Sequence, residues 1–365
     1  MLYFVLMYID LLIDFSKLFY YNIGLVPIVE IPYAKYLDCA ADMFLEAVNT
    51  YWLSNGNQSV GMLIRLQGFD KGLFGGNYHT HNSLPLPPGL DVVCYSNGAD
   101  YVRGLRYVAR QIRAGRVVLS VDSTHLLTRR HLSEEERDKK WLTYYPSTSE
   151  GDLAFSDVII YHQGGTPEDG VDGRKSSDDH NDPHNNVTDN DRRIDKKSKF
   201  NMSDEDYALI EDRAVALHRG TTVAVVTYGN GVPTSLLALS SHFRSVEGTV
   251  NIPTEAVSKE VFAVVDCPCL SQLPAQLEEF LRSAPSLHSV VFADVCKLGT
   301  APLSTYAVQL QNKGIFSKNS IRPKNIHWTV IGASDTYNPL GNTLTFLSVS
   351  DINEAVIGLL RNNTE

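Results

Sequence analysis

The sequence lacks an excess of basic residues, which is the usual mark of a chain that binds nucleic acid. Its 365 residues include 42 Asp and Glu against 32 Lys and Arg, which gives a formal net charge of −10. No stripe of basic residues with interleaved aromatics stands out. Because contacts with phosphates supply most nucleic-acid affinity, this balance argues against nucleic acid as the main partner.

Cysteine is also scarce. The five cysteines are scattered along the chain, and the only close pair is in Cys267-Pro268-Cys269. An odd, scattered set argues against a disulfide framework and favours reduced thiols. Since no second pair lies at the spacing of a zinc ribbon, we interpret the close pair as structural.

A long apolar run without charge is missing as well. The most apolar stretch, residues 1–22, contains Asp10, Asp14 and Lys17. A membrane-spanning helix needs about 20 apolar residues without such charges. A secretory signal needs a basic start and a small-residue cleavage site, and neither is visible. We therefore interpret residues 1–22 as a helix buried in the fold, and a membrane anchor is the less favoured alternative.

What the sequence contains is an alternation of apolar strands and helices in two blocks. The first block predicts strands at 25–31, 60–65, 90–95 and 116–122, with helices near 37–53 and 99–113. The second predicts strands at 222–228, 261–266, 289–293 and 326–331, with helices near 232–243, 274–284, 302–313 and 351–361. Fully apolar strands joined by helices are typical of parallel sheets covered on both faces, so the predicted class is α/β.

The segment between the two blocks has a different composition. Residues 163–205 are dense in Asp, Asn, Gly and charge and contain almost no large apolar side chains. A segment this long and polar cannot bury enough surface to order itself, so we predict a disordered insertion. It lies within a linker over 131–212, which separates a domain at 1–130 from a domain at 213–365.

One stretch in the first block concentrates residues that can carry chemistry. Residues 75–83 read GGNYHTHNS. The two histidines could be metal ligands, an acid/base pair, or incidental members of a polar turn. A His-x-His metal site needs further ligands, and no suitable cluster stands out. In an extended loop, His81 would point away from the side that His79 faces.

His79 has a functional and a structural interpretation, and the residues alone leave both open. Glycines after a buried strand let the backbone approach a ligand closely, and parallel sheets bind ligands at this carboxyl edge. An imidazole there can transfer protons near neutral pH. The competing interpretation is a histidine that is hydrogen-bonded within the fold.

The residues around this stretch resemble a known family. The chain reads EIPYAKY at 30–36, GGNYHTHNS at 75–83 and PGLDVV at 88–93. The family typically reads E-I-Q-F-A-D-Y, G-G-x-Y-H-S-Q-S-P and P-G-L-K-V-V. Residues 220–232, GTTVAVVTYGNGV, resemble the start of its C-terminal domain. The chain is similar to the beta subunit of the thiamine-dependent, decarboxylating component of 2-oxo acid dehydrogenases, and the branched-chain (2-oxoisovalerate) type is closest.

This resemblance implies a transketolase-like pyrimidine-binding domain that is short at its N-terminus. A transketolase C-terminal-like α/β domain would follow it. Thiamine diphosphate would lie between this chain and an alpha subunit that holds magnesium, so no metal ligands are expected here. Tyr36 matches a tyrosine that packs on the aminopyrimidine ring. His79 matches a histidine linked to proton transfer or to reductive acylation of the lipoyl group. Extending the match without gaps places Asp10 where the family has a glutamate that contacts a pyrimidine nitrogen.

The resemblance also implies partners, a location and alternatives. The expected partners are the alpha subunit, in an α2β2 heterotetramer, and a lipoyl-bearing acyltransferase core, with no nucleic acid and no membrane. The expected location is the mitochondrial matrix, and the expected role is in branched-chain amino acid catabolism. The alternatives are a catalytically silent paralogue that serves assembly, a pyruvate dehydrogenase-type beta subunit, and a protein that binds another nucleotide-like ligand.

Overall fold

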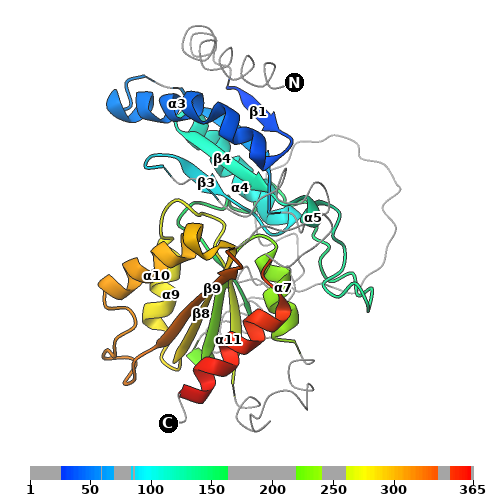
Figure 1. Cartoon of the computed structure of the whole chain (residues 1–365), viewed down its shortest axis with the longest axis vertical. Helices are drawn as coiled ribbons and strands as arrows, with labels where there is room; N and C mark the ends of the chain where they lie inside the picture. The colour runs from blue at the N-terminus through cyan, green and yellow to red at the C-terminus, as the bar shows by residue number, and fades with distance from the viewer. Residues whose placement is uncertain are drawn as a thin grey trace.

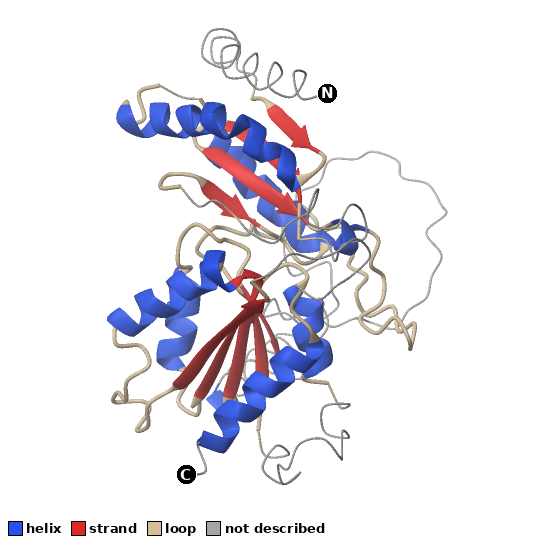
Figure 2. Cartoon of the chain, viewed as in Figure 1, coloured by secondary structure: helices blue, strands red, loops and turns tan. Residues whose placement is uncertain are grey.

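The computed structural model describes residues 26–58, 60–69, 84, 87–162, 219–240, 260–335 and 346–362. Within these residues the chain is an α/β protein with two mostly parallel sheets, of four and five strands, flanked by helices (Figure 2). The predicted fold class is confirmed at this level.

The first sheet has the strand order β1-β2-β4-β3, and all its neighbouring strands are parallel. Its elements are β1 (Ile28–Ile31), η2 (Ala34–Ala40), α3 (Ala41–Leu53), β2 (Met62–Gln67), β3 (Asp91–Val93), α4 (Gly98–Arg113), β4 (Val117–Asp122) and α5 (Thr124–Leu127). The β1-to-β2 and β3-to-β4 connections run in opposite directions along the sheet. Right-handed crossovers therefore put α3 and α4 on opposite faces (Figure 1). The two connections start at the two edges of the sheet and end at the neighbouring central strands, β2 and β4.

The second sheet has the order β5-β7-β6-β8-β9, in which only β5 is antiparallel to its neighbour. Its elements are β5 (Ile159–His162), β6 (Val223–Thr227), α7 (Gly231–Ala238), β7 (Phe262–Asp266), α9 (Ala275–Ser283), β8 (Ser289–Lys297), η6 (Leu298–Thr300), α10 (Pro302–Asn312), β9 (His327–Ala333) and α11 (Val349–Asn362). Helices α7 and α11 lie together on one face, and α9 and α10 cover the other (Figure 1).

The two blocks of strands and helices predicted from the apolar pattern match the structure to within a few residues. The prediction omitted β5, a four-residue edge strand whose sequence IIYH is too short to show a period. It also omitted the single turn of α5. The helix predicted over 1–22 and the insertion predicted over 163–205 lie outside the described residues.

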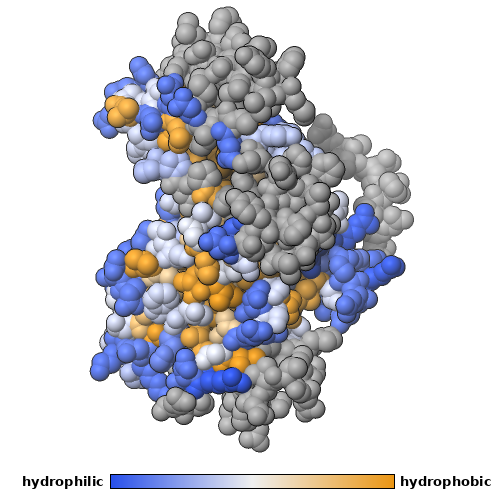
Figure 3. Space-filling model, in the orientation of Figure 1, coloured by the Kyte–Doolittle hydropathy of each residue, from blue (hydrophilic) through white to orange (hydrophobic). Residues whose placement is uncertain are grey.

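The apolar strands account for the core. Every residue of β6, VAVVT, and of β7, FAVVD, is buried, as expected for central strands covered on both faces. Strand β9, at the edge of the sheet, is partly exposed along most of its length. Figure 3 shows hydrophobic residues gathering over the second sheet, in the region where Figure 1 labels β8 and β9.

Two expectations from composition can be compared with the described residues. The four cysteines whose side chains are described, Cys94, Cys267, Cys269 and Cys296, are buried and form no disulfide, in agreement with the sequence prediction. In the part of the chain that the structure describes, no helix is both long and apolar enough to span a membrane.

Candidate functional site

The carboxyl ends of strands from both sheets meet at the boundary between the sheets. Asn230, which follows β6, donates a hydrogen bond from Nδ2 to the backbone oxygen of Phe69, which follows β2, at 2.7 Å. The rings of Phe69 and Tyr228 pack edge to face with centroids 5.9 Å apart. Beyond β3, the backbone N–H of Cys94 donates to the oxygen of Pro268 at 2.8 Å. Because open α/β sheets bind ligands beyond the carboxyl ends of their strands, this boundary is the candidate site.

The end of β2 lies beside the end of β4 at the carboxyl edge of the first sheet. The N–H of Gly68 donates to the backbone oxygen of Asp122, at the end of β4, at 3.0 Å. A Cβ on Gly68 would lie 3.1 Å from Val121 Cγ1, so this close approach favours glycine. Phe69 then takes a positive φ of 57°, which is uncommon for a non-glycine residue. The chain therefore turns sharply at the carboxyl edge of the sheet, where ligands of such folds bind.

Of the residues that the sequence singled out, Tyr36 is described. It lies in η2, directly after the carboxyl end of β1, and is partly exposed. Its N–H donates to the backbone oxygen of Tyr33 at 3.0 Å, and the two rings pack edge to face at 5.7 Å. Asp10, His79 and His81 lie outside the described residues, and their proximity to Tyr36 stays a prediction.

A cluster that sequence reasoning missed lies between β2, α4 and β4. Arg65 donates to Asp122 Oδ2 from Nη2 at 2.6 Å and from Nε at 3.1 Å. The Tyr101 hydroxyl donates to the same oxygen at 3.2 Å, and the Arg65 guanidinium lies 6.0 Å from the Tyr101 ring centroid. Burial, with a further contribution from Asp122, raises the pKa of Tyr101 to about 12. Tyr101 therefore stays protonated near neutral pH and acts as a hydrogen-bond donor to Asp122.

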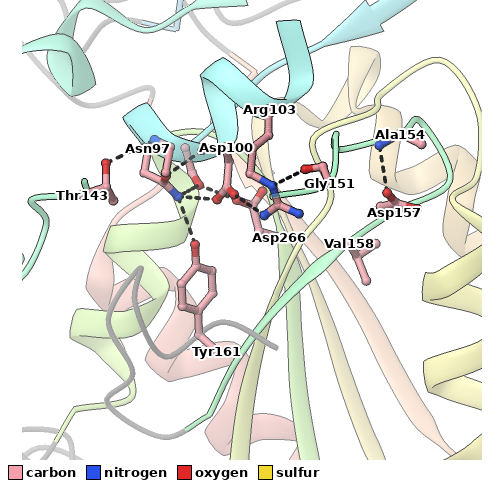
Figure 4. A network of polar contacts seen from close by, with 12 residues as sticks. Asn97, Asp100, Arg103, Thr143, Gly151, Ala154, Asp157, Val158, Tyr161 and Asp266 are labelled. Carbon is pink, nitrogen blue, oxygen red and sulfur yellow. Dashed lines mark hydrogen bonds and ion pairs between the residues drawn. The ribbon is translucent and has the colours of Figure 1, made fainter. Parts of the chain in front are cut away.

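A second missed cluster joins the two sheets (Figure 4). Asn97 caps the N-terminus of α4 by accepting from the N–H of Asp100 at 3.0 Å. Its Nδ2 donates to Asp100 Oδ2 at 2.5 Å and to the Tyr161 hydroxyl of β5 at 3.2 Å. Ser96 donates a short hydrogen bond to Oδ2 of Asp266, at the end of β7. This cluster fixes the start of α4 against the second sheet.

Burial raises the pKa of three carboxyl groups at or near this boundary. The pKa of Asp266 is raised well above its ordinary value of 3.8, and the hydrogen bond from Ser96 offsets this only in part. Burial also raises the pKa of Asp294 to about 7, although the Tyr228 hydroxyl donates to it at 2.6 Å. The pKa of Asp91 rises to about 6, against the opposing effect of Arg116 at 2.5 Å.

The free energy of unfolding should therefore fall by roughly 2 kcal/mol or more between pH 5 and pH 8. In the folded chain these carboxyls hold protons that the unfolded chain has released above about pH 4. Their stabilising effect is complete below that pH. The effect is lost as the pH rises through the pKa values of these groups in the folded chain, which are about 6 for Asp91 and about 7 for Asp294. Urea unfolding at the two pH values measures the change.

A pair of variants identifies the carboxyl groups responsible for this change. Asp266→Asn should make the fall in unfolding free energy shallower. Asparagine has a shape similar to that of aspartate but does not titrate, so the variant lacks one buried titrating group. Asp335→Asn, at an exposed aspartate, should leave the fall unchanged. A parent chain whose unfolding free energy rises from pH 5 to pH 8 would contradict the assignment.

Signals for both missed clusters were present in the sequence. Asn97 stands between a predicted strand and a predicted helix, which is where a capping asparagine is expected. Asp122 is the last residue of its strand and therefore lies at the edge that binds ligands. No local pattern reveals the partners, because Arg65 and Asp266 lie 57 and 170 positions from the residues that they contact.

The described part of the boundary offers aromatic surface and hydrogen-bonding groups. Tyr36 presents a partly exposed ring held in place by Tyr33, which suits a planar heterocycle. Among the described residues, no group of three or more His, Cys, Asp and Glu side chains could hold a metal ion.

Comparison of the chain with protein-family models and with curated proteins found no match. The fold and the geometry above therefore stand on the sequence and the structure of this chain.

Proposed function

We propose that the chain is a beta-type subunit of a branched-chain 2-oxo acid dehydrogenase that works with thiamine diphosphate in the mitochondrial matrix. It would assemble with an alpha subunit as an α2β2 heterotetramer and pass acyl groups to the lipoyl groups of an acyltransferase core. The observation that supports the proposal is the place of Tyr36, which is the resembling site residue that the structure describes. Tyr36 follows β1 at its carboxyl end, and in the sequence the GGNYHTHNS stretch comes after β2, whose carboxyl end lies at the same edge of the sheet.

Each resembling residue has a proposed task. Tyr36 would pack against the aminopyrimidine ring of the cofactor. Asp10 would hydrogen-bond a ring nitrogen, and His79 would transfer a proton near the reacting carbons. Thiamine diphosphate, when bound, supplies the stabilised carbanion that 2-oxo acid decarboxylation requires, and the protein orients it. The alpha subunit would hold the diphosphate and magnesium.

Co-expression with an alpha subunit of this enzyme class tests the proposal. The expected results are a stable heterotetramer, thiamine diphosphate binding in the presence of Mg²⁺, and decarboxylation of 2-oxoisovalerate. A preference for pyruvate would favour the pyruvate-type alternative. A heterotetramer without cofactor binding would favour the silent paralogue. Absence of both assembly and binding would overturn the family assignment itself.

Tyr36→Ala should weaken thiamine diphosphate binding to the heterotetramer by about tenfold, because an aromatic contact contributes roughly 0.5–1.5 kcal/mol beyond its buried area. Tyr36→Phe keeps the ring and should bind within about twofold of the parent chain. Tyr144→Ala, at a tyrosine whose side chain is 82% exposed, is the matched control. Cofactor titration monitored by fluorescence measures all three. Equal affinity of the Ala and Phe variants at position 36 would contradict the stacking role.

A further inference from the structure

The outer edge of β9 has no partner strand among the described residues. In the second sheet, β8 is the single described neighbour of β9. The N–H of His327 donates to the oxygen of His288 at 2.8 Å, so His327 and every second residue after it face β8. The backbone groups of Trp328, Val330 and Gly332 therefore point away from β8. No backbone hydrogen bond from another described residue reaches them there.

The sequence of β9 lacks the features that usually keep an exposed edge from pairing. Its seven residues, HWTVIGA, include no Lys, Asp, Glu or Pro, which protect edge strands in folded proteins. The irregularity in its pairing falls within β8, between Ala293 and Lys297, and not within β9. The opposite edge of the sheet is the four-residue strand β5, which offers fewer backbone groups. The edge at β9 is therefore a template for a further strand.

Apolar side chains flank this edge. Leu298, in η6, is 48% exposed, and a Cβ on Gly332 would lie 3.2 Å from its Cδ2. Val308, in α10, is 55% exposed and lies one turn before Gln311, whose Oε1 accepts from Trp328 Nε1 at 3.3 Å. Hydrophobic residues gather in this region of Figure 3. We call the outer side of β9, together with Leu298 and Val308, the β9 edge surface. Apolar surface beside an unpaired strand is typical of a protein interface.

The charges at the two ends of β9 favour a second copy of the chain as the occupant. Lys324 precedes the strand and Asp335 follows it, and both are exposed. If two copies pair antiparallel about a two-fold axis at Val330, the basic end of each strand meets the acidic end of the other. Such a contact is self-complementary. An uncharged strand is also where two chains of net charge −10 repel each other least.

We infer that the chain forms a two-fold dimer in which β9 pairs antiparallel with β9 of a second copy. The pairing joins two five-stranded sheets into one and covers the apolar side chains of the β9 edge surface. The assembly is closed, because each copy uses its β9 edge once. This inference concerns the chain by itself and does not rest on the proposed thiamine chemistry.

Sedimentation equilibrium of the full-length chain, without an alpha subunit, tests this pairing. A dimer with a dissociation constant of about 10 μM or tighter is expected. A chain that stays monomeric at about 100 μM would overturn the inference, and so would assemblies that keep growing with concentration. Since no alpha subunit is present, the result is independent of the co-expression experiment.

Two substitutions on the β9 edge surface locate the contact. Val330→Pro removes an N–H that points away from β8, where an edge strand tolerates proline, and should weaken dimerisation about tenfold or more. Val308→Lys places a charge on the apolar flank and should weaken dimerisation about tenfold at an unchanged melting temperature. Leu53→Lys, at an 87% exposed leucine of α3, is the matched control and should dimerise like the parent chain. Parent-like dimerisation of both β9 edge variants, or an equal loss in the control, would contradict the assignment.

Exchange of the end charges tests whether the partner is a second β9 strand in antiparallel orientation. Lys324→Glu should weaken dimerisation about fivefold, because it replaces two opposite-charge contacts per dimer by like-charge contacts. Adding Asp335→Lys to the same chain should restore the affinity of the parent chain. A double variant that dimerises no more tightly than Lys324→Glu alone would show that the two strands do not pair in this way.

Discussion

His79→Ala should lower the turnover of the assembled dehydrogenase complex by about 100-fold or more and leave thiamine diphosphate affinity nearly unchanged. A positioned acid/base group typically contributes this much to rate, while a cofactor held by stacking and by its diphosphate does not depend on that group for binding. His79 follows β2 along the chain, and β2 ends at the carboxyl edge of the first sheet, where parallel sheets bind ligands. Steady-state turnover and cofactor titration on the same heterotetramer separate the two effects.

His81→Ala is the matched control for this experiment. The two histidines are separated by one residue in GGNYHTHNS, so both substitutions remove the same type of side chain from the same segment. In an extended loop they face opposite sides, and His81→Ala should keep most of the turnover. If His79→Ala turned over like the parent complex, the role of His79 would be wrong. If both variants lost cofactor affinity equally, a structural role for the segment would be favoured.

The second large effect is on stability. Gly61→Ala should lower the free energy of unfolding by about 3 kcal/mol or more. Gly61 directly precedes β2, and a Cβ there would lie 1.7 Å from the backbone oxygen of Ile112, at the end of α4, and 3.1 Å from the Cα of Gly115. Both are backbone atoms, so no side chain can rotate away. The clash would separate α4 from the start of β2, and urea unfolding of the soluble fraction would measure the loss.

Gly358→Ala provides a control that should change the free energy of unfolding in the opposite direction. Gly358 is an exposed residue within α11, and a Cβ there would meet nothing within 4 Å. Replacing an exposed helical glycine by alanine should stabilise the chain by roughly 0.5–1 kcal/mol, because alanine has the higher helix propensity. A Gly61→Ala chain as stable as the Gly358→Ala chain would contradict the contact between α4 and the start of β2.

The sequence by itself determined most of the secondary structure and the α/β class. Apolar runs such as VAVVT and FAVVD, separated by helical patterns, predict strands buried on both faces, and both are buried throughout. It also placed Tyr36 just beyond a strand, which is where the structure has it. These predictions succeed because strands and helices are recognised by the spacing of apolar residues within a short segment of the sequence.

Only the tertiary structure decided the order of the strands and the partners of the polar residues. The apolar pattern does not predict that β3 is the edge strand next to β4 in the first sheet. Nor does it predict that IIYH joins the second sheet as an antiparallel edge strand. The pairing of Ser96 with Asp266, and of Arg65 with Asp122, depends on which strand ends meet at the boundary between the sheets. Such contacts join residues far apart in the chain, and local spacing does not encode them.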